Sequence, residues 1–345
     1  MRAWLAAIRF VKGSTLGPVW ESPRRDDHLV LPDGERLHTF VFEPRGAHRG
    51  TILFLHGMTV LGNRDPRQIR ACQLLAGLGY RVVSPLIPDL EGLRVASRCV
   101  ASVAEAIAET ARRADLGGQA PVGVFSVSYS AGIALIAAAR PEASPYVASV
   151  CAIGAYASGV GWTRFLFEDP GADEYARLIA WWNLLPAVIG PEPALFAAVH
   201  AAAADLVDVS GPPLLPSALE ALDPRERALF EQLRADPDFR AEMGARILAG
   251  VAQGVFADVC PEDAAPRLRV PISLLHGAGD NVIPPGESAT LHKVLQARGA
   301  PSRLIVTDLL THGDVQLTPR AILESFEVVR TFAHFFGAIS SPVAS

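Results

Sequence analysis

The chain has 345 residues, of which 50% are hydrophobic and 19% are charged, and its formal net charge is −5. This length and apolar content predict one large domain, or a core that carries an inserted lobe. The negative charge balance provides no basic surface for nucleic acid, so we expect no nucleic-acid partner.

The N-terminal segment, residues 1–10, is apolar but is interrupted by Arg9, and no cleavage site follows it. The apolar run is too short for a signal peptide, so we expect a short surface helix that leans on the protein or contacts a membrane surface. The four cysteines are widely scattered and form no C-x-x-C pair, which argues against a disulfide framework and against a metal site. We therefore expect a cytoplasmic protein without a metal.

Strand and helix patterns alternate over residues 1–157. Two short strands flank a Pro32-Asp33-Gly34 turn and predict a hairpin between residues 26 and 42. The alternating patterns that follow lie at 51–55, 66–79, 81–85, 97–116, 123–127, 133–139 and 147–153. Such alternation is typical of βαβ units, so we expect a mostly parallel sheet.

The alternation is interrupted between residues 158 and 266. This segment reads as helices and loops, with a capping acid before a proline at Asp223-Pro224 and at Asp236-Pro237. Strand patterns return at 272–275 and 303–306, and the last helix pattern begins at Pro319. We therefore expect an α/β core, residues 1–157 and 267–345, with an α-helical cap inserted at 158–266. The core is expected to be a doubly wound sheet of about eight strands with helices on both faces.

Residues 123–132, GVFSVSYSAG, have the pattern of a strand that enters a small-residue turn and then a helix. This is the form of a nucleophile elbow, in which a serine sits on a strained turn with its hydroxyl exposed. The usual pattern is G-x-S-x-G, whereas serine here takes both glycine positions around Ser128. A register centred on Ser130 would keep one glycine and stays open. We favour Ser128, because Ser130-Ala131-Gly132 then supplies small residues where the helix packs close to the strand.

Two later loops carry an acid and a base, which an activated serine needs. The segment LLHGAGDNVIP is an apolar strand that ends in a glycine-bearing loop and presents Asp280. The segment LLTHGD presents His312 between the last predicted strand and the last predicted helix. An alternative role for Asp280 is to cap the following helix, but Glu287 is nearer to that helix start and better suited to capping.

These three segments resemble the motifs of the α/β-hydrolases, in which the serine, the acid and the histidine follow in this order along the chain. The resemblance covers nearly the whole chain outside the predicted cap. It implies that Ser128 attacks, His312 removes its proton and Asp280 orients the imidazole. It also implies an oxyanion hole formed by the backbone N–H groups of Met58 and Tyr129.

The activity implied by the resemblance is hydrolysis of a small-molecule carboxylic ester through an acyl-enzyme, without a cofactor. Because the predicted cap is apolar, we expect a substrate with an apolar acyl group. Thioester hydrolysis and acyl transfer use the same intermediate and stay open, as does a non-catalytic binding protein with this fold. Arg64 and Arg67 are candidate ligands for a substrate carboxylate or phosphate, the alternative being an ion pair with Asp65.

Overall fold

The computed structural model describes residues 1–15, 20–250, 252–310 and 319–339. Eight strands form one sheet in the order β1-β2-β4-β3-β5-β6-β7-β8. The β1–β2 and β2–β4 pairs are antiparallel and the other five pairs are parallel. The strands are β1 (Arg24–Val30), β2 (Arg36–Phe42), β3 (Thr51–Leu55), β4 (Arg81–Pro85), β5 (Val122–Val127), β6 (Val147–Ile153), β7 (Ile272–Gly277) and β8 (Ser302–Thr307). The mostly parallel sheet of about eight strands and the hairpin are confirmed.

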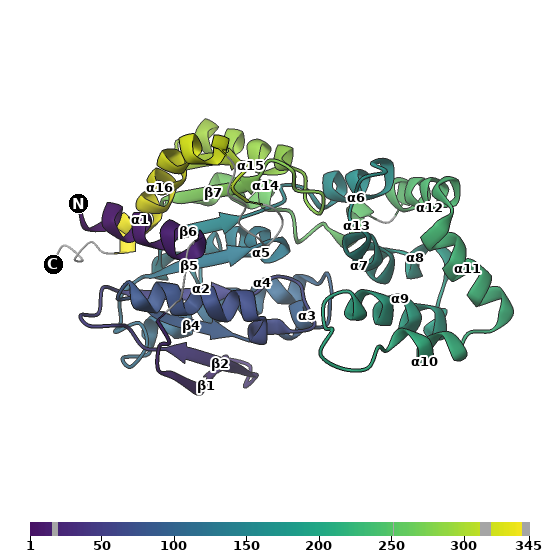
Figure 1. Ribbon diagram of the computed structural model, residues 1–345, viewed down its shortest axis with the longest axis horizontal. Helices are drawn as coiled ribbons and strands as arrows, with labels where there is room; N and C mark the ends of the chain where they lie inside the picture. Colours follow the sequence, from purple (N-terminus) through teal and green to yellow (C-terminus); the bar gives the residue numbers. More distant parts are fainter. Residues whose placement is uncertain (16–19, 251, 311–318, 340–345) are drawn as a thin grey trace.

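Helices cover both faces of the sheet, as Figure 1 shows. One face packs against α1 (Arg2–Thr15), α2 (Pro66–Gly77) and α16 (Pro319–Ile339) through a core rich in phenylalanine. The other face packs against α4 (Ser97–Arg112), α5 (Tyr129–Ala138) and α15 (Pro285–Ala297). A short helix, α3 (Pro88–Glu91), precedes α4. Because both faces are covered, β3 is buried along its whole length, as the apolar run from Ile52 to Leu55 predicts.

Between β6 and β7 the described residues form helices and loops only. Figure 1 shows all but the last of these helices beyond the carboxyl ends of the parallel strands, at the opposite end of the molecule from α1, whereas the last lies beside α15. They are α6 (Gly159–Glu168), α7 (Glu174–Leu184), α8 (Pro186–Ile189), α9 (Pro193–Asp205), α10 (Leu215–Glu220), α11 (Pro224–Ala235), α12 (Pro237–Gly250), α13 (Ala252–Val255) and α14 (Pro261–Ala264). We refer to this set as the inserted helices.

Capping residues define where several helices begin. Asp223 and Glu226 form a reciprocal capping box at the start of α11, where Pro224 takes the first helical position. Asp65 accepts a hydrogen bond from the Arg67 amide at the start of α2. The helix after β5 begins at Tyr129, four residues before the sequence pattern indicates. All ten residues of α5 are buried, so the helix has no polar face that would show its period.

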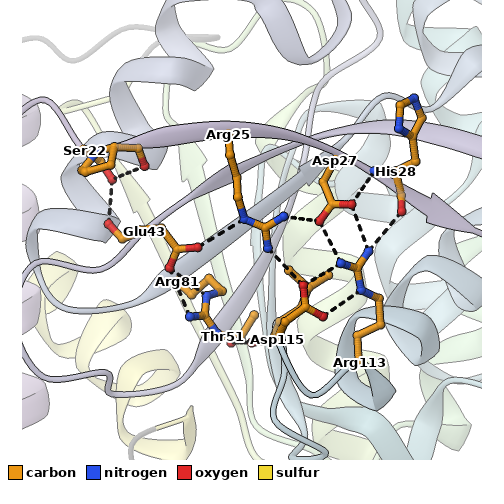
Figure 2. Close-up of polar contacts among 11 residues, drawn as sticks. Ser22, Arg25, Asp27, His28, Glu43, Thr51, Arg81, Arg113 and Asp115 are labelled. Atoms are coloured by element: carbon orange, nitrogen blue, oxygen red, sulfur yellow. Dashed lines mark hydrogen bonds and ion pairs between the residues drawn. The ribbon is translucent and has the colours of Figure 1, made fainter.

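An ion-pair network joins the antiparallel edge of the sheet to the loop after α4. Figure 2 shows Arg25 of β1 and Arg113 converging on Asp27 and Asp115. Arg113 donates to both carboxylates, at 2.8 Å to Asp27 and 2.6 Å to Asp115. Burial alone would raise the pKa of Asp27, but hydrogen bonds from Arg113, the His28 amide and Arg25 outweigh it and lower the pKa to about 2. The network therefore joins the hairpin to the loop after α4 at neutral pH.

Gly132 allows α5 to approach the loop after β6. A Cβ placed on Gly132 would lie 2.3 Å from the Tyr156 ring, which is fully buried and donates from its hydroxyl to the Val259 carbonyl. We expect Gly132→Ala to lower the free energy of unfolding by about 1–3 kcal/mol, because the fixed ring must shift. Urea denaturation measures the change. Gly250→Ala is the control, because its Cβ would meet open space, and an equal loss there would contradict the close-packing argument.

Candidate active site

Ser128 lies at the junction between β5 and α5 with a left-handed backbone, φ 60° and ψ −141°. Only three non-glycine residues in the described part of the chain have a positive φ, and Ser128 is one of them. Such a conformation costs a residue with a Cβ about 1–3 kcal/mol and persists where the surrounding structure holds it. Here the Ser128 amide donates to the Ile153 carbonyl at 2.7 Å, which fixes the turn to the end of β6. The geometry is that of a nucleophile elbow.

The serines at the two glycine positions both bond to backbone carbonyls. The Ser126 hydroxyl donates to the Cys151 carbonyl at 3.3 Å, and the Ser130 hydroxyl donates to the Val127 carbonyl at 2.8 Å. Both side chains are fully buried, whereas Ser128 is partly exposed. The structure therefore accommodates the unusual Ser-x-Ser-x-Ser pattern without leaving either flanking hydroxyl unpaired.

The loop after β3 passes directly over Ser128. A Cβ placed on Gly57 would lie 3.7 Å from the Ser128 Cβ. His56 holds this loop, because its Nδ1–H donates to the Gly57 carbonyl at 2.7 Å and its Nε2 accepts from the Ile87 amide at 3.0 Å. These two contacts indicate that His56 fixes the loop. Met58, the predicted oxyanion donor, follows directly in this loop.

Burial lowers the pKa of His56 to about 4. An unfolded histidine titrates near 6.5, so the unfolded state binds a proton first as the pH falls. The stability that neutral His56 contributes is complete above pH 6.5 and is lost between pH 6.5 and about 4. The shift corresponds to roughly 3 kcal/mol. We expect urea denaturation to show a shallower fall in stability from pH 7 to 5 for His56→Gln than for the parent chain, and parallel curves would contradict it.

Asp280 is buried in the loop after β7, with 7% of its surface exposed. Its Oδ1 accepts hydrogen bonds from the Val282 and Ile283 amides, each at 2.9 Å. Its Oδ2 lies 3.5 Å from Nε2 of His276, and that nitrogen donates to the Ile283 carbonyl at 2.8 Å. These contacts fix the carboxylate. Asp280 does not cap α15, the helix that follows, which was the alternative role considered from the sequence.

Gly154, at the end of β6, brings the Asp280 carboxylate close to the elbow. A Cβ on Gly154 would lie 3.6 Å from Oδ2 of Asp280 and 3.8 Å from the amide nitrogen of Ser128. Two predicted site residues that are 152 positions apart in sequence therefore border the same glycine. The third, His312, lies outside the described residues.

Three contacts join the inserted helices to these loops. The Tyr175 hydroxyl of α7 donates to the Met58 carbonyl at 2.7 Å. The indole N–H of Trp162 donates to the Val282 carbonyl at 2.8 Å, and the Asp173 amide donates to the Asn281 carbonyl at 2.9 Å. Sequence reasoning missed Tyr175, because a tyrosine in an apolar helix pattern gives no sign of which loop it meets.

Comparison with known proteins identifies the fold. No protein-family model matches the sequence, and no curated protein sequence matches it. Among solved structures, brefeldin A esterase, a bacterial homologue of human hormone-sensitive lipase, aligns with TM-score 0.53 and 17% identity, over 98% of this chain and 85% of that one. An esterase of Pyrococcus furiosus aligns with TM-score 0.54 and 12% identity, over 94% of this chain and 97% of that one.

An acylaminoacyl peptidase of Pyrococcus horikoshii aligns over 94% of this chain with TM-score 0.54 and 14% identity, but only 43% of the peptidase is covered. The present chain therefore spans less than half of the length of that peptidase. The chain has the α/β-hydrolase fold.

In this α/β-hydrolase fold, Arg64 and Arg67 are paired with acids near the loop after β3. Arg67 pairs with Asp65 at 2.8 Å, and Arg64 pairs with Glu91. Arg67 therefore forms the ion pair with Asp65 that the sequence analysis gave as the alternative to substrate binding.

Glu287 differs from its sequence interpretation. It lies in the first turn of α15, but its carboxylate accepts from the Ala157 and Ser158 amides, at 2.7 and 2.9 Å, and no side chain caps α15. The prediction that Glu287 caps the helix on which it lies is wrong. The residue instead fixes the point where the chain leaves the α/β-hydrolase core for the inserted helices.

The described part of this α/β-hydrolase fold contains neither a candidate metal cluster nor a membrane-spanning helix. No cluster of three or more His, Cys, Asp or Glu side chains suited to a metal ion occurs among those residues. The same residues contain no helix with both the length and the apolar character needed to cross a bilayer.

Proposed function

We propose that the chain is a serine hydrolase that cleaves carboxylic esters, with Ser128 as nucleophile, His312 as base and Asp280 as the acid that orients the base. The observation that carries this proposal is the left-handed backbone of Ser128 at the strand–helix junction, beside the loop that holds the Asp280 carboxylate. A strained serine at this place exposes its hydroxyl at the carboxyl end of the sheet. The hydroxyl of Ser130 instead donates to the Val127 carbonyl, which favours the register centred on Ser128.

The proposed reaction proceeds through an acyl-enzyme. The Ser128 Oγ bonds to the ester carbonyl carbon while His312 takes the hydroxyl proton. The bond from that carbon to the alkoxy oxygen then breaks, and His312 returns the proton to the departing alcohol. A water molecule then attacks the acyl carbon while His312 takes a proton from it. The bond to Ser128 breaks, His312 returns the proton to the serine, and the carboxylic acid is released. Asp280 holds the imidazole in the tautomer that each step requires.

The oxyanion of each tetrahedral intermediate would bond to two backbone N–H groups. Tyr129 is the first residue of α5, so its N–H has no partner within the helix and lies at the positive end of the helix dipole. Met58 lies in the loop that passes over Ser128 and supplies the second N–H. Removing one such donor typically costs about 10²–10³-fold in kcat.

Tyr175 is proposed as a positioning residue for that loop. Its hydroxyl donates to the carbonyl of Met58 at 2.7 Å, and burial raises the pKa of the phenol, so it stays a neutral donor. We expect Tyr175→Phe to lower kcat by about fivefold while KM changes little, because the lost hydrogen bond of about 1 kcal/mol loosens the oxyanion donor. Steady-state kinetics with a p-nitrophenyl ester measure both constants. A rise in KM with unchanged kcat would contradict the positioning role.

An ester is favoured as substrate because the two esterases align with this chain over most of their own length. The acylaminoacyl peptidase aligns over less than half of its length. Thioester hydrolysis and acyl transfer use the same acyl-enzyme and are the alternatives. A panel of p-nitrophenyl esters of increasing acyl length, an acyl thioester and an acylated amino-acid anilide separates these classes. We expect the highest kcat/KM with an ester that carries an apolar acyl chain, and an optimum at acetate would contradict an apolar acyl pocket.

Labelling with a fluorophosphonate probe tests the proposal directly. We expect the parent chain to be labelled, with the phosphonyl group on Ser128, and Ser128→Ala to be unlabelled. Ser130→Ala is the matched control and should keep its labelling. Absence of labelling in a folded sample would favour the non-catalytic binding protein. Labelling that survives Ser128→Ala but not Ser130→Ala would assign the nucleophile to Ser130.

A reducing compartment, the cytoplasm, is proposed from the cysteines. All four are free, and Cys72, Cys99 and Cys151 are buried. Burial raises the pKa of each of these three thiols, which makes them poor nucleophiles. Such a set is typical of proteins that fold without disulfides.

A further inference from the structure

Helix α1 presents apolar side chains on two sides. Ala6, Ala7 and Phe10 are buried in the core against α16. On the outer side Met1, Trp4, Leu5 and Ile8 are exposed, at 97%, 38%, 49% and 48% of their surfaces. Their spacing of three and four residues places them in one row along the helix. This row has no role in the packing of the core.

Helix α16 extends the exposed row. Phe326 is 61% exposed, and its ring centroid lies 5.6 Å from that of Trp4. We call Met1, Trp4, Leu5, Ile8 and Phe326 the outer patch. A continuous group of large exposed apolar side chains on two adjacent helices is typical of an interaction surface.

On the α1 side the outer patch is flanked by positive charge, although the whole chain has a net charge of −5; on the α16 side it is flanked by the ion pair between Glu327 and Arg330. Helix α1 carries Arg2, Arg9 and Lys12, and residues 1–20 contain no aspartate or glutamate. Arg2 and Arg9 are exposed beside the apolar row. A bulky apolar row with a tryptophan and flanking cations matches the interfacial layer of an anionic bilayer, where indole rings and cationic side chains lie at the headgroups.

We propose that α1 and the adjoining part of α16 dock the protein on the surface of a membrane that contains anionic lipids, with the outer patch inserted among the headgroups. A second copy of the chain fits this surface less well. A two-fold contact would bring Arg2 and Arg9 of both copies together, and Glu327, the acid beside Phe326, is already paired with Arg330. The helix lies in the plane of the membrane and does not cross it.

Another exposed apolar group lies among the inserted helices and provides a comparison. Leu206, Val209 and Leu214 are 50%, 86% and 56% exposed, but Asp205 and Asp208 accompany them. Two carboxylates are repelled by an anionic surface. The loop after α9 is therefore the matched control for exposed apolar area without positive charge.

The position of α1 determines the orientation of the docked protein. Figure 1 shows α1 at one end of the molecule and the inserted helices at the other, where the parallel strands end. Docking through the outer patch thus turns Ser128 and the inserted helices toward the aqueous side. Substrate would reach the site from solution rather than from the bilayer.

Co-sedimentation with sucrose-loaded vesicles tests the proposal. One set is pure phosphatidylcholine. The other contains about 30% phosphatidylserine, so that its surface is negatively charged, as is the cytoplasmic leaflet, whose surface potential is roughly −30 mV. We expect the parent chain to bind the anionic vesicles at least about tenfold more strongly than the neutral ones, and raised salt to weaken this binding. The triple variant Trp4→Ser, Leu5→Ser, Ile8→Ser should lose at least about tenfold in partitioning, because it removes most of the inserted apolar area.

The pair Leu206→Ser, Val209→Ser is the control and should bind like the parent. Arg9→Glu should weaken binding to anionic vesicles while leaving the apolar row intact. Near-ultraviolet circular dichroism and thermal unfolding show whether each variant keeps its fold. Binding that the folded triple variant retains, or that depends equally on the control pair, would overturn the proposal. A dimer in sedimentation velocity that the triple variant abolishes would assign the outer patch to a second copy instead.

Discussion

Replacement of Ser128 by alanine is expected to lower kcat/KM for p-nitrophenyl ester hydrolysis by about 10⁴-fold or more, since the covalent route then lacks its nucleophile. Ser130→Ala should change activity less than about tenfold, because its hydroxyl donates to the Val127 carbonyl. Steady-state kinetics on purified, folded variants measure both effects. Activity of Ser128→Ala within tenfold of the parent would exclude Ser128 as the nucleophile.

The backbone of Ser128 gives this variant a second, independent readout. Since φ is 60°, alanine retains the strain of a Cβ in the left-handed region, whereas glycine relieves it. We expect Ser128→Gly to be more stable than Ser128→Ala by about 1 kcal/mol, with both equally inactive. If urea denaturation gave the two variants equal free energies of unfolding, the strained turn would be contradicted, but the proposed role of Ser128 as nucleophile would not be affected.

Replacement of Asp280 by asparagine is expected to lower kcat by about 10²–10⁴-fold. The side-chain oxygen of asparagine can still accept from the Val282 and Ile283 amides, so the loop should keep its place. The amide lacks the charge that stabilises the imidazolium and the acceptor that selects its tautomer. The loss should therefore appear in kcat rather than in KM.

Asp27→Asn is the matched control for the loss of a carboxylate. Asp27 belongs to the ion-pair network at the hairpin, away from Ser128, and its pKa is held at about 2. We expect this variant to lose about 1 kcal/mol of stability while its activity is unchanged. An equal loss of activity in both variants would mean that the Asp280 effect reflects general destabilisation.

The sheet was predictable because its parallel strands are short apolar runs separated by amphipathic helices. β3 and β6 match their expected ranges, and β5 differs by one residue at its start. The start of α5 was not predictable, since a helix buried on every side has no polar period to reveal it. The period of polar residues in a sequence shows which face of a helix is exposed to solvent, and no face of α5 is exposed.

The segment around Ser128 and the loop that carries Asp280 could be named as candidate site segments because the patterns that predict them are local in sequence. The contacts that hold them are not local. Tyr175 meets Met58 across 117 positions, and Glu287 meets Ala157 across 130 positions. A long-range hydrogen bond leaves no period in the sequence, so neither partner could be assigned before the fold was known. For the same reason the sequence did not show that the Glu287 carboxylate bonds to these distant amides and not to its own helix.

The pairing of α1 with α16 also affects synthesis of the chain. The buried side of α1, with Ala6, Ala7 and Phe10, packs on residues such as Phe332 that leave the ribosome roughly 320 positions later. At about 5–20 residues per second this interval is of the order of tens of seconds. During that time α1 lacks α16, its main partner, although α2 and Phe125 of β5, which also contact it, have already been made. We expect the nascent chain to require a chaperone that binds its first residues, or early contact with a lipid surface, to avoid aggregation.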